Sequence, residues 1–178
     1  MSEWRPQRPD NKTAAAQIID CASAADLVIM AQERDATDRP YNEDTVGYTI
    51  RNCGRPVLVI PQDFRANTIG ESILLGWSAI REATHAAHDI LSIAASGALV
   101  RLLSAEQPPD DGTTAHDLVE TYRRHGLLAE VIYRELGSKT VVETILREAN
   151  LLGSDLIATG AFGHTCGHDK VIGATTTN

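Results

Sequence analysis

Asp155-Leu156-Ile157-Ala158-Thr159, followed at once by Gly160-Ala161-Phe162-Gly163 and nine residues later by Gly173-Ala174-Thr175, is the stretch that decides the fold. A short apolar run that ends in glycines predicts a buried strand followed by a loop. Glycines let the backbone turn with positive φ and bring bare N–H groups close to a ligand. A phosphate suits such a loop, because the helix that begins at the last glycine also favours an anion.

The spacing of these glycines differs from that of two well-known phosphate-binding loops. The P-loop ends in Gly-Lys-Ser or Gly-Lys-Thr, which does not occur in this chain. The dinucleotide-binding fingerprint places its glycines closer together. The stretch therefore predicts a phosphate-binding loop of another kind.

Strands and helices are predicted to alternate along the part of the chain before this loop. Apolar runs of strand length cover Ile73–Trp77, Ala98–Leu103, Leu128–Arg134 and Leu156–Ala158. Between these runs, apolar residues recur at helical spacing. The three helical sets are Ala83, Ala86, Ala87, Ile90 and Ala94, then Ala115, Leu118, Val119 and Tyr122, then Val142, Ile145, Leu146 and Ala149. Such alternation predicts right-handed crossovers and a parallel sheet with helices on both faces, whose ligand crevice lies at the carboxyl ends of the strands.

The N-terminal part repeats the end of this pattern. Ala15, Ile18, Ile19 and Ala22 match the last helical set, and the predicted strand Ala25–Ile29 matches Ser154–Ala158. A further helical face follows at Val46, Thr49, Ile50 and Cys53, and Val57–Ile60 reads as a strand. The first 65 residues therefore predict a helix, a strand, a helix and a strand.

These features together resemble the universal stress protein family. The loop Gly160-x2-Gly163-x9-Gly173 resembles the family's ATP-binding loop. Ile73–Trp77 with Arg81–Thr84 resembles its first strand and first helix, and Gly54–Pro61 resembles its closing strand. The resemblance implies a doubly wound, parallel-sheet α/β sandwich of the nucleotide-binding, α-hydrolase-like, universal-stress type.

The resemblance also implies two domains, each lacking a part. Residues 1–65 resemble the remnant of a first domain, and residues 66–178 resemble a second domain without its final helix and strand. An unpaired sheet edge is a liability. We therefore expect Val57–Ile60 to complete the sheet of the second domain, either in cis or across a homodimer.

The function implied by the resemblance is non-catalytic adenine-nucleotide binding in stress-response signalling, with ATP and Mg as the cofactors. Backbone amides of the loop would hold the phosphates, the Thr175 hydroxyl would add a contact, and Trp77 would either flank the adenine or pack in the core. The predicted nucleotide-binding residues are Gly160, Gly163, His164, Gly173, Ala174, Thr175, Trp77 and Ser78. No catalytic residue is predicted, and the sequence leaves slow ATP hydrolysis open.

Two positions depart from the family pattern. Ser78 stands where the family has an acidic residue that contacts adenosine, and Ile80 stands where a small hydroxyl residue is expected. A single hydroxyl lacks the charge and the two oxygens with which a carboxylate holds ribose. The alternative function is therefore a ligand-free stress protein that acts through dimerisation or partner docking.

A metal site on the loop is a second alternative. His164, Cys166 and His168 place imidazole and thiolate ligands at alternate positions, with Asp169 beside them, and such ligands suit zinc or copper. Structural zinc sites usually bring two ligand pairs together, and no second Cys/His pair lies nearby in the sequence. Solvated loop residues remain the simpler interpretation.

The composition limits the remaining classes of function. The net charge of −8 argues against a nucleic-acid surface, because binding to the phosphate backbone depends on Lys and Arg. No apolar run is long enough to span a membrane and no leader pattern is present, so we expect a cytoplasmic protein. The three cysteines show no paired spacing and fit a reducing compartment.

Overall fold

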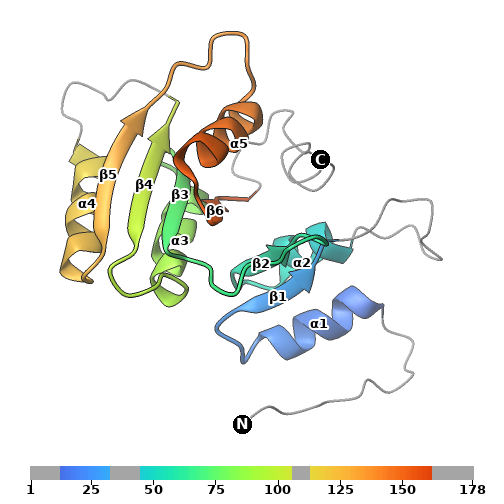
Figure 1. The fold of residues 1–178 in the computed structure, drawn as a ribbon. Helices are drawn as coiled ribbons and strands as arrows, with labels where there is room; N and C mark the ends of the chain where they lie inside the picture. Colours follow the sequence, from blue (N-terminus) through green and yellow to red (C-terminus); the bar gives the residue numbers. More distant parts are fainter. Residues whose placement is uncertain (1–12, 33–44, 106–112, 162–178) are drawn as a thin grey trace. The chain divides into compact units, whose positions relative to one another are not determined.

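The computed structural model describes residues 13–32, 45–105 and 113–161 (Figure 1). The chain divides into two compact units, Met1–Phe64 and Arg65–Asn178. This boundary lies one residue before the predicted one. The interpretation of the units as incomplete domains of one family stays a prediction.

The first unit contains the predicted helix, strand, helix and strand. They are α1 (Ala14–Ala22), β1 (Val28–Ala31), α2 (Thr45–Asn52) and β2 (Val57–Ile60). The strand predicted over Ala25–Ile29 begins later than expected, because the Ala25 amide donates to the carbonyl of Ala22 and extends the turn after α1. Pairing begins at Val28, whose amide donates to the carbonyl of Pro56.

Strand β2 pairs with β1 in a parallel, two-stranded sheet, with Val28 opposite Val57 and Ala31 opposite Ile60. Within the described residues β2 has its partner in its own unit, and the expectation that Val57–Ile60 completes the sheet of the second unit in cis stays a prediction. The sequence of β2 does not specify which strand it pairs with, because the apolar run Val-Leu-Val-Ile can pair with the edge of any parallel sheet. Tertiary packing decides the pairing. The version of that expectation across a homodimer stays a prediction.

The second unit is an alternating α/β structure with a four-stranded parallel sheet in the order β5-β4-β3-β6. All four predicted strands and all three predicted helices are confirmed. The strands are β3 (Ser72–Trp77), β4 (Leu99–Ser104), β5 (Leu128–Tyr133) and β6 (Leu156–Thr159). The helices are α3 (Arg81–Asp89), continued by the 3-10 turn η2 (Ile90–Ser92), α4 (Thr113–Arg124) and α5 (Val141–Leu152).

Helices cover both faces of this sheet, as expected for a doubly wound fold (Figure 1). Ile73 and Leu75 of β3 pack with Ala87 of α3 and Leu118 of α4 in the larger core. Leu74 points to the opposite face and packs with Ile145 of α5. Because side chains alternate along a strand, the central strand β3 is buried on both sides.

A buried hydrogen bond joins α3 and α4 within the larger core. The Tyr122 hydroxyl of α4 donates to the carbonyl of Ala87 at 2.8 Å. Burial raises the pKa of the Tyr122 phenol above its ordinary value. The phenol therefore stays protonated and remains a hydrogen-bond donor.

The ends of α5 are set by local signals. The Thr140 hydroxyl accepts from the Glu143 amide while the Glu143 carboxylate accepts from the Thr140 amide, which is a capping box. Gly153 ends the helix in the left-handed conformation, with φ of 60°. Thr13 caps α1 by accepting from the Ala16 amide, so the two repeated helices begin in the same way.

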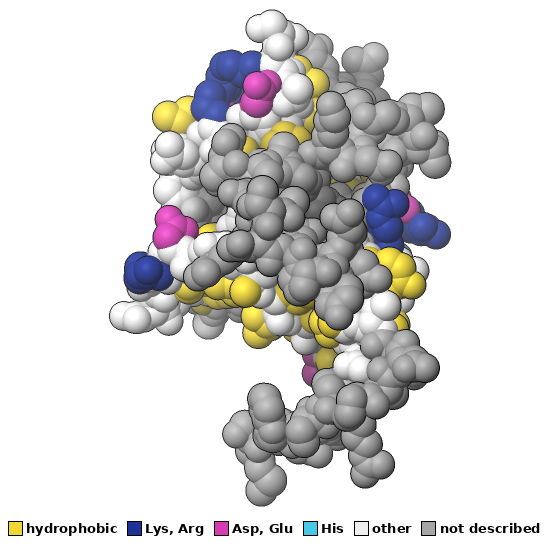
Figure 2. All heavy atoms as spheres, turned by 90° about the vertical axis from the view of Figure 1, so that its right-hand side faces the viewer, with side chains coloured by type: hydrophobic (Ala, Val, Ile, Leu, Met, Phe, Trp, Pro, Cys, Tyr) yellow, Lys and Arg dark blue, Asp and Glu magenta, His cyan; other side chains and the backbone are white. Residues whose placement is uncertain are grey.

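Charged side chains on the face drawn in Figure 2 lie in mixed groups, with acidic side chains beside the basic ones. Arg101 of β4 and Glu130 of β5 form an ion pair at 2.8 Å. Within the described part of the chain, no helix is both long and apolar enough to cross a membrane.

Candidate functional site

The candidate site lies where β3 and β6 end side by side. Gly76 of β3 is opposite Thr159 of β6 in a parallel register, so Ser78 and Gly160 follow the two strands at the same edge of the sheet. The chain runs from β3 to β4 on one side and returns to β6 on the other side, which makes this point the topological switch of the sheet. Ligands of open α/β sheets bind at such a point.

Gly160 is required for packing at this edge. A Cβ atom on Gly160 would lie 2.6 Å from the carbonyl carbon of Glu82 and 2.7 Å from the Ala83 nitrogen. The first turn of α3 therefore rests directly on the backbone at the end of β6. Sequence reasoning assigned Gly160 to phosphate binding. The structure adds a second reason for a glycine at this position, which is the close packing of α3.

The first turn of α3 already carries a negative charge. A hydrogen bond from its own backbone amide, together with the Arg81 guanidinium, holds the pKa of Glu82 below its ordinary value. The N-cap residue, Ile80, supplies no side-chain cap. The Glu82 carboxylate complements the helix dipole here and pairs with Arg81 of the same turn at 2.9 Å.

Ser78 is placed at the edge as predicted. The Ser78 carbonyl accepts from the Ile80 amide at 2.8 Å, which turns the chain from β3 into α3. Its hydroxyl makes no hydrogen bond to the described residues and is free to contact a ligand. One hydroxyl can make fewer contacts to a ribose than a carboxylate can.

Trp77 is the last residue of β3 and directly precedes Ser78. It packs with the larger core on the α3 and α4 side, whereas a Cβ on the preceding residue, Gly76, would lie 3.1 Å from Ile145 Cδ1 of α5. Trp77 lines a groove of about 330 Å³ between α3 and α4. Ser78 and Gly160 therefore follow the neighbouring ends of β3 and β6, and the Trp77 side chain packs on the α3 and α4 side. That Trp77 flanks an adenine stays a prediction.

The other predicted site residues lie outside the described residues. They are Gly163, His164, Gly173, Ala174 and Thr175, together with the metal alternative formed by His164, Cys166 and His168. Among the residues that the structure does describe, no group of three or more His, Cys, Asp or Glu could hold a metal ion.

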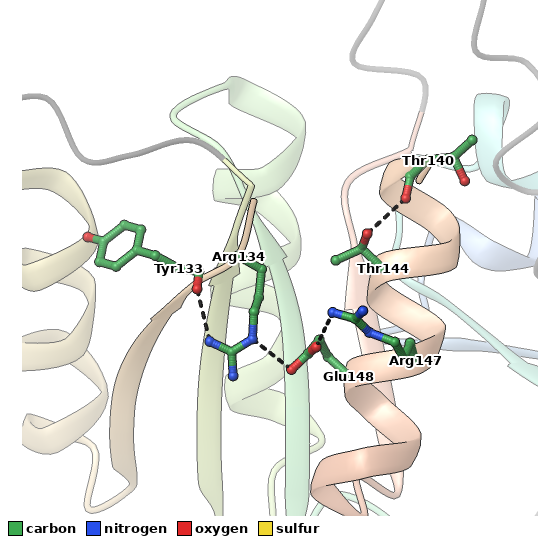
Figure 3. A network of polar contacts seen from close by, with 6 residues as sticks. All are labelled: Tyr133, Arg134, Thr140, Thr144, Arg147 and Glu148. Atoms are coloured by element: carbon green, nitrogen blue, oxygen red, sulfur yellow. Dashed lines mark hydrogen bonds and ion pairs between the residues drawn. The ribbon is translucent and has the colours of Figure 1, made fainter. Parts of the chain in front are cut away.

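Sequence reasoning missed a buried carboxylate on α5, shown in Figure 3. Glu148 has a side chain only 4% exposed and accepts hydrogen bonds from Arg134 at 3.0 Å and Arg147 at 2.8 Å. Arg134 also donates to the Tyr133 carbonyl at the end of β5. Burial acts to raise the pKa of Glu148, but the two arginines outweigh it and the pKa lies below its ordinary value.

The network joins α5 to the edge strand β5. Its sequence signal is the position of Glu148, which falls between Ile145 and Ala149 on the apolar face of the helix. A charged residue on an apolar face predicts a buried partner of opposite charge. The partner could not be identified from one sequence, because several arginines lie near enough along the chain.

Comparison with known proteins supports the fold. No family model and no curated protein matches the chain. A universal stress protein from Archaeoglobus fulgidus DSM 4304 is similar in structure, with a TM-score of 0.61 and 14% identity over 80% of this chain and 53% of that one. The chain thus spans about half the length of that protein. At this identity the likeness establishes the fold alone, and it confirms the expected universal-stress-type α/β architecture.

Two further solved structures are similar over a smaller part of the chain. A protein of the universal stress protein family from Burkholderia pseudomallei has a TM-score of 0.47 and 19% identity, over 62% of this chain and 93% of that one. A protein from Mycobacterium tuberculosis H37Rv has a TM-score of 0.44 and 18% identity, over 56% of this chain and 78% of that one.

Proposed function

We propose that this chain is a universal-stress-protein-like, non-catalytic binding protein for adenine nucleotides that acts in stress-response signalling. The observation that supports the proposal is that Ser78 and Gly160 follow the paired strands β3 and β6 at the switch point of the sheet. The sequence that continues from Gly160 has the glycine spacing of a phosphate-binding loop. Fold and loop therefore point to the same edge.

The residues at this edge fit a nucleotide in part. The phosphates of ATP, with Mg as counter-ion, would be held by backbone amides at Gly160, Gly163 and Gly173 and by the Thr175 hydroxyl. Ser78 would contact the ribose through one hydroxyl. Bound ATP would supply the signal, and no residue of this chain is assigned to cleave it.

The electrostatics support a site made of amides. The chain has a net charge of −8 at pH 7, and Glu82 beside the edge is ionised and pairs with Arg81. A triphosphate is therefore repelled at long range and depends on short-range hydrogen bonds. We expect the affinity for Mg-ATP to exceed that for free ATP, since the cation reduces the repulsion.

Isothermal titration calorimetry with Mg-ATP tests the proposal. We expect Gly163→Val to abolish binding, because a branched side chain there would obstruct the loop. Ser78→Asp combined with Ile80→Ser should tighten binding, because it restores the carboxylate and the small hydroxyl residue. Ser92→Asp is the matched control, since it adds the same charge at η2 and should leave the affinity unchanged.

A second candidate function is favoured by Ser78 itself. Without a carboxylate to hold ribose, the same fold can act as a ligand-free protein through homodimerisation or partner docking. Binding of Mg-ATP by the Ser78→Asp, Ile80→Ser variant but not by the parent would select this candidate. Binding by the parent, lost in Gly163→Val, would select the nucleotide sensor.

A further inference from the structure

The groove between α3 and α4 has an unusual distribution of hydrogen-bonding groups. Its walls include Trp77, Thr84, His88, Asp117, Leu118 and Thr121. At about 330 Å³ it is within the lower range of small-molecule sites. The buried Leu118 is one of its lining residues.

Two of the three threonine hydroxyls in the groove, those of Thr84 and Thr121, have already used their only proton. Thr84 Oγ1 donates to the Ile80 carbonyl at 3.0 Å, and Thr121 Oγ1 donates to the Asp117 carbonyl at 2.9 Å. A hydroxyl has one proton and two lone pairs, so each can act toward a ligand only as an acceptor. The Asp117 carboxylate is a third acceptor and pairs with no described residue.

The remaining walls fit a flat, positively charged group. The Trp77 ring contributes an aromatic surface, and a cation over an indole ring is attracted by its negative face. The Asp117 carboxylate can accept two parallel N–H bonds from an amidinium or guanidinium group. A metal ion fits the groove less well. Asp117 and His88 are two possible ligands, and among the described residues no group of three or more His, Cys, Asp or Glu could hold a metal ion.

We propose that this groove binds a small planar organic cation that bears several N–H donors, of the amidinium or guanidinium class. The cation stacks on Trp77, pairs with Asp117 and donates to Thr84 and Thr121. The groove lining also includes Ala79, the residue after Ser78, so the groove adjoins the edge proposed for the nucleotide, whereas Asp117 and Thr121 belong to α4.

Tryptophan fluorescence can test this proposal directly. The chain has two tryptophans, so Trp4→Phe leaves Trp77 as the single reporter. We expect benzamidine to change the Trp77 emission with a saturable titration curve. Benzoate has a similar shape and the opposite charge, and it should not bind.

Two variants on α4 supply the matched comparison, each in the Trp4→Phe background. Asp117→Asn should weaken benzamidine at least about tenfold, since a charge-assisted pair is lost. Glu120→Gln removes one charge from the same helix outside the groove walls and should leave the affinity unchanged. Both positions are exposed, so circular dichroism should show the same fold in each.

Several results would overturn the proposal. These are a non-saturable benzamidine titration, equal binding of benzoate, or equal affinity in Asp117→Asn and the parent. Displacement of benzamidine by Mg-ATP would also overturn it, because the groove would then belong to the nucleotide site. The titration contains no nucleotide, so a failure of ATP binding leaves its result unaffected.

Discussion

Gly160 lies where the end of β6 meets the first turn of α3, and a side chain has no room there. The nearest atoms are backbone atoms of Glu82 and Ala83, which cannot move aside without shifting the helix. We expect Gly160→Ala to lower the free energy of unfolding by about 1–3 kcal/mol, as overpacking usually does. Urea unfolding followed by circular dichroism measures this loss.

The repeat in the first unit offers a control for this substitution. In the repeat, Ala31 at the end of β1 corresponds to Gly160. Ala31 already carries a Cβ atom, so a side chain is accommodated at that position. Ala31→Gly should change stability by less than Gly160→Ala does. Equal stability of Gly160→Ala and the parent would show that α3 does not rest on β6 as described.

Sequence reasoning could select Gly160 but could not give the packing reason for it. The glycine pattern is local, so the chain alone predicts a turn and a close approach. Which group approaches depends on how α3 returns over the sheet, and that is a tertiary property. The same limit applies to Trp77, whose aromatic character indicates a pocket or a core without deciding between them.

Asp155 fixes the start of β6 to the start of β3. Its carboxylate accepts from the Glu71 amide at 2.9 Å and from the Ser72 amide at 3.1 Å. We expect Asp155→Ala to lower the free energy of unfolding by about 1–2 kcal/mol, because two hydrogen bonds to a charged group are lost at an exposed position. Thermal unfolding measures the change.

Asp26 precedes β1 in the repeat and is the matched control. It is exposed, and among the described residues its carboxylate accepts no hydrogen bond. Asp26→Ala should therefore leave stability unchanged within about 0.5 kcal/mol. If the two alanine variants were equally stable, the hydrogen bonds of Asp155 would contribute nothing.

The attachment of α5 to β5 through Glu148 predicts a pH dependence. The pKa of Glu148 is lowered from 4.5 in the folded protein, so its ionised form stabilises the fold at neutral pH. This contribution is fully present above the unfolded pKa and is lost as the pH falls below about 4.5 through the folded value. Stability should therefore decrease in acid.

Comparison with Glu148→Gln isolates this effect. Glu82 and Glu143 also have lowered pKa values, but they titrate in both proteins. We expect the variant to be less stable than the parent at pH 7 and to lose less stability between pH 7 and about pH 3.5. An identical acid loss in both proteins, measured by urea unfolding, would contradict the role given to Glu148.

The elements of the second unit could be predicted closely because their periodicity is strong. Each strand is found within two residues of its predicted position, and the helical faces of α3 and α4 bury Ala83, Ala87 and Tyr122 as expected. The short strand β1 was displaced because its apolar run includes residues that belong to the preceding turn. The buried ion pair was missed because Arg134 and Glu148 are 14 residues apart.

The two units should differ in their ability to fold alone. Among the described residues, the two apolar core clusters consist of residues from the second unit. The sheet of the first unit has two strands of four residues each, and isolated two-stranded sheets are marginal in water. We expect a fragment of residues 65–178 to unfold cooperatively and a fragment of residues 1–64 to show little cooperative structure.

Circular dichroism of the two separate fragments during urea unfolding tests this difference. A cooperative transition in the first fragment, or none in the second, would contradict the assignment of the stable core to the second unit. The outcome also bears on the sequence interpretation. The repeat predicted two related segments, but periodicity alone could not show how much core each would have.

Thermal unfolding of the whole chain with and without millimolar Mg-ATP tests the central claim most directly. A ligand present at about 100 times its dissociation constant stabilises the folded state by roughly 2.7 kcal/mol. We expect a clear rise in the midpoint with Mg-ATP and none with adenosine, because in the proposed function the sequence that continues from Gly160 would hold the phosphates. An unchanged midpoint in a cooperatively unfolding sample would contradict nucleotide binding at this edge.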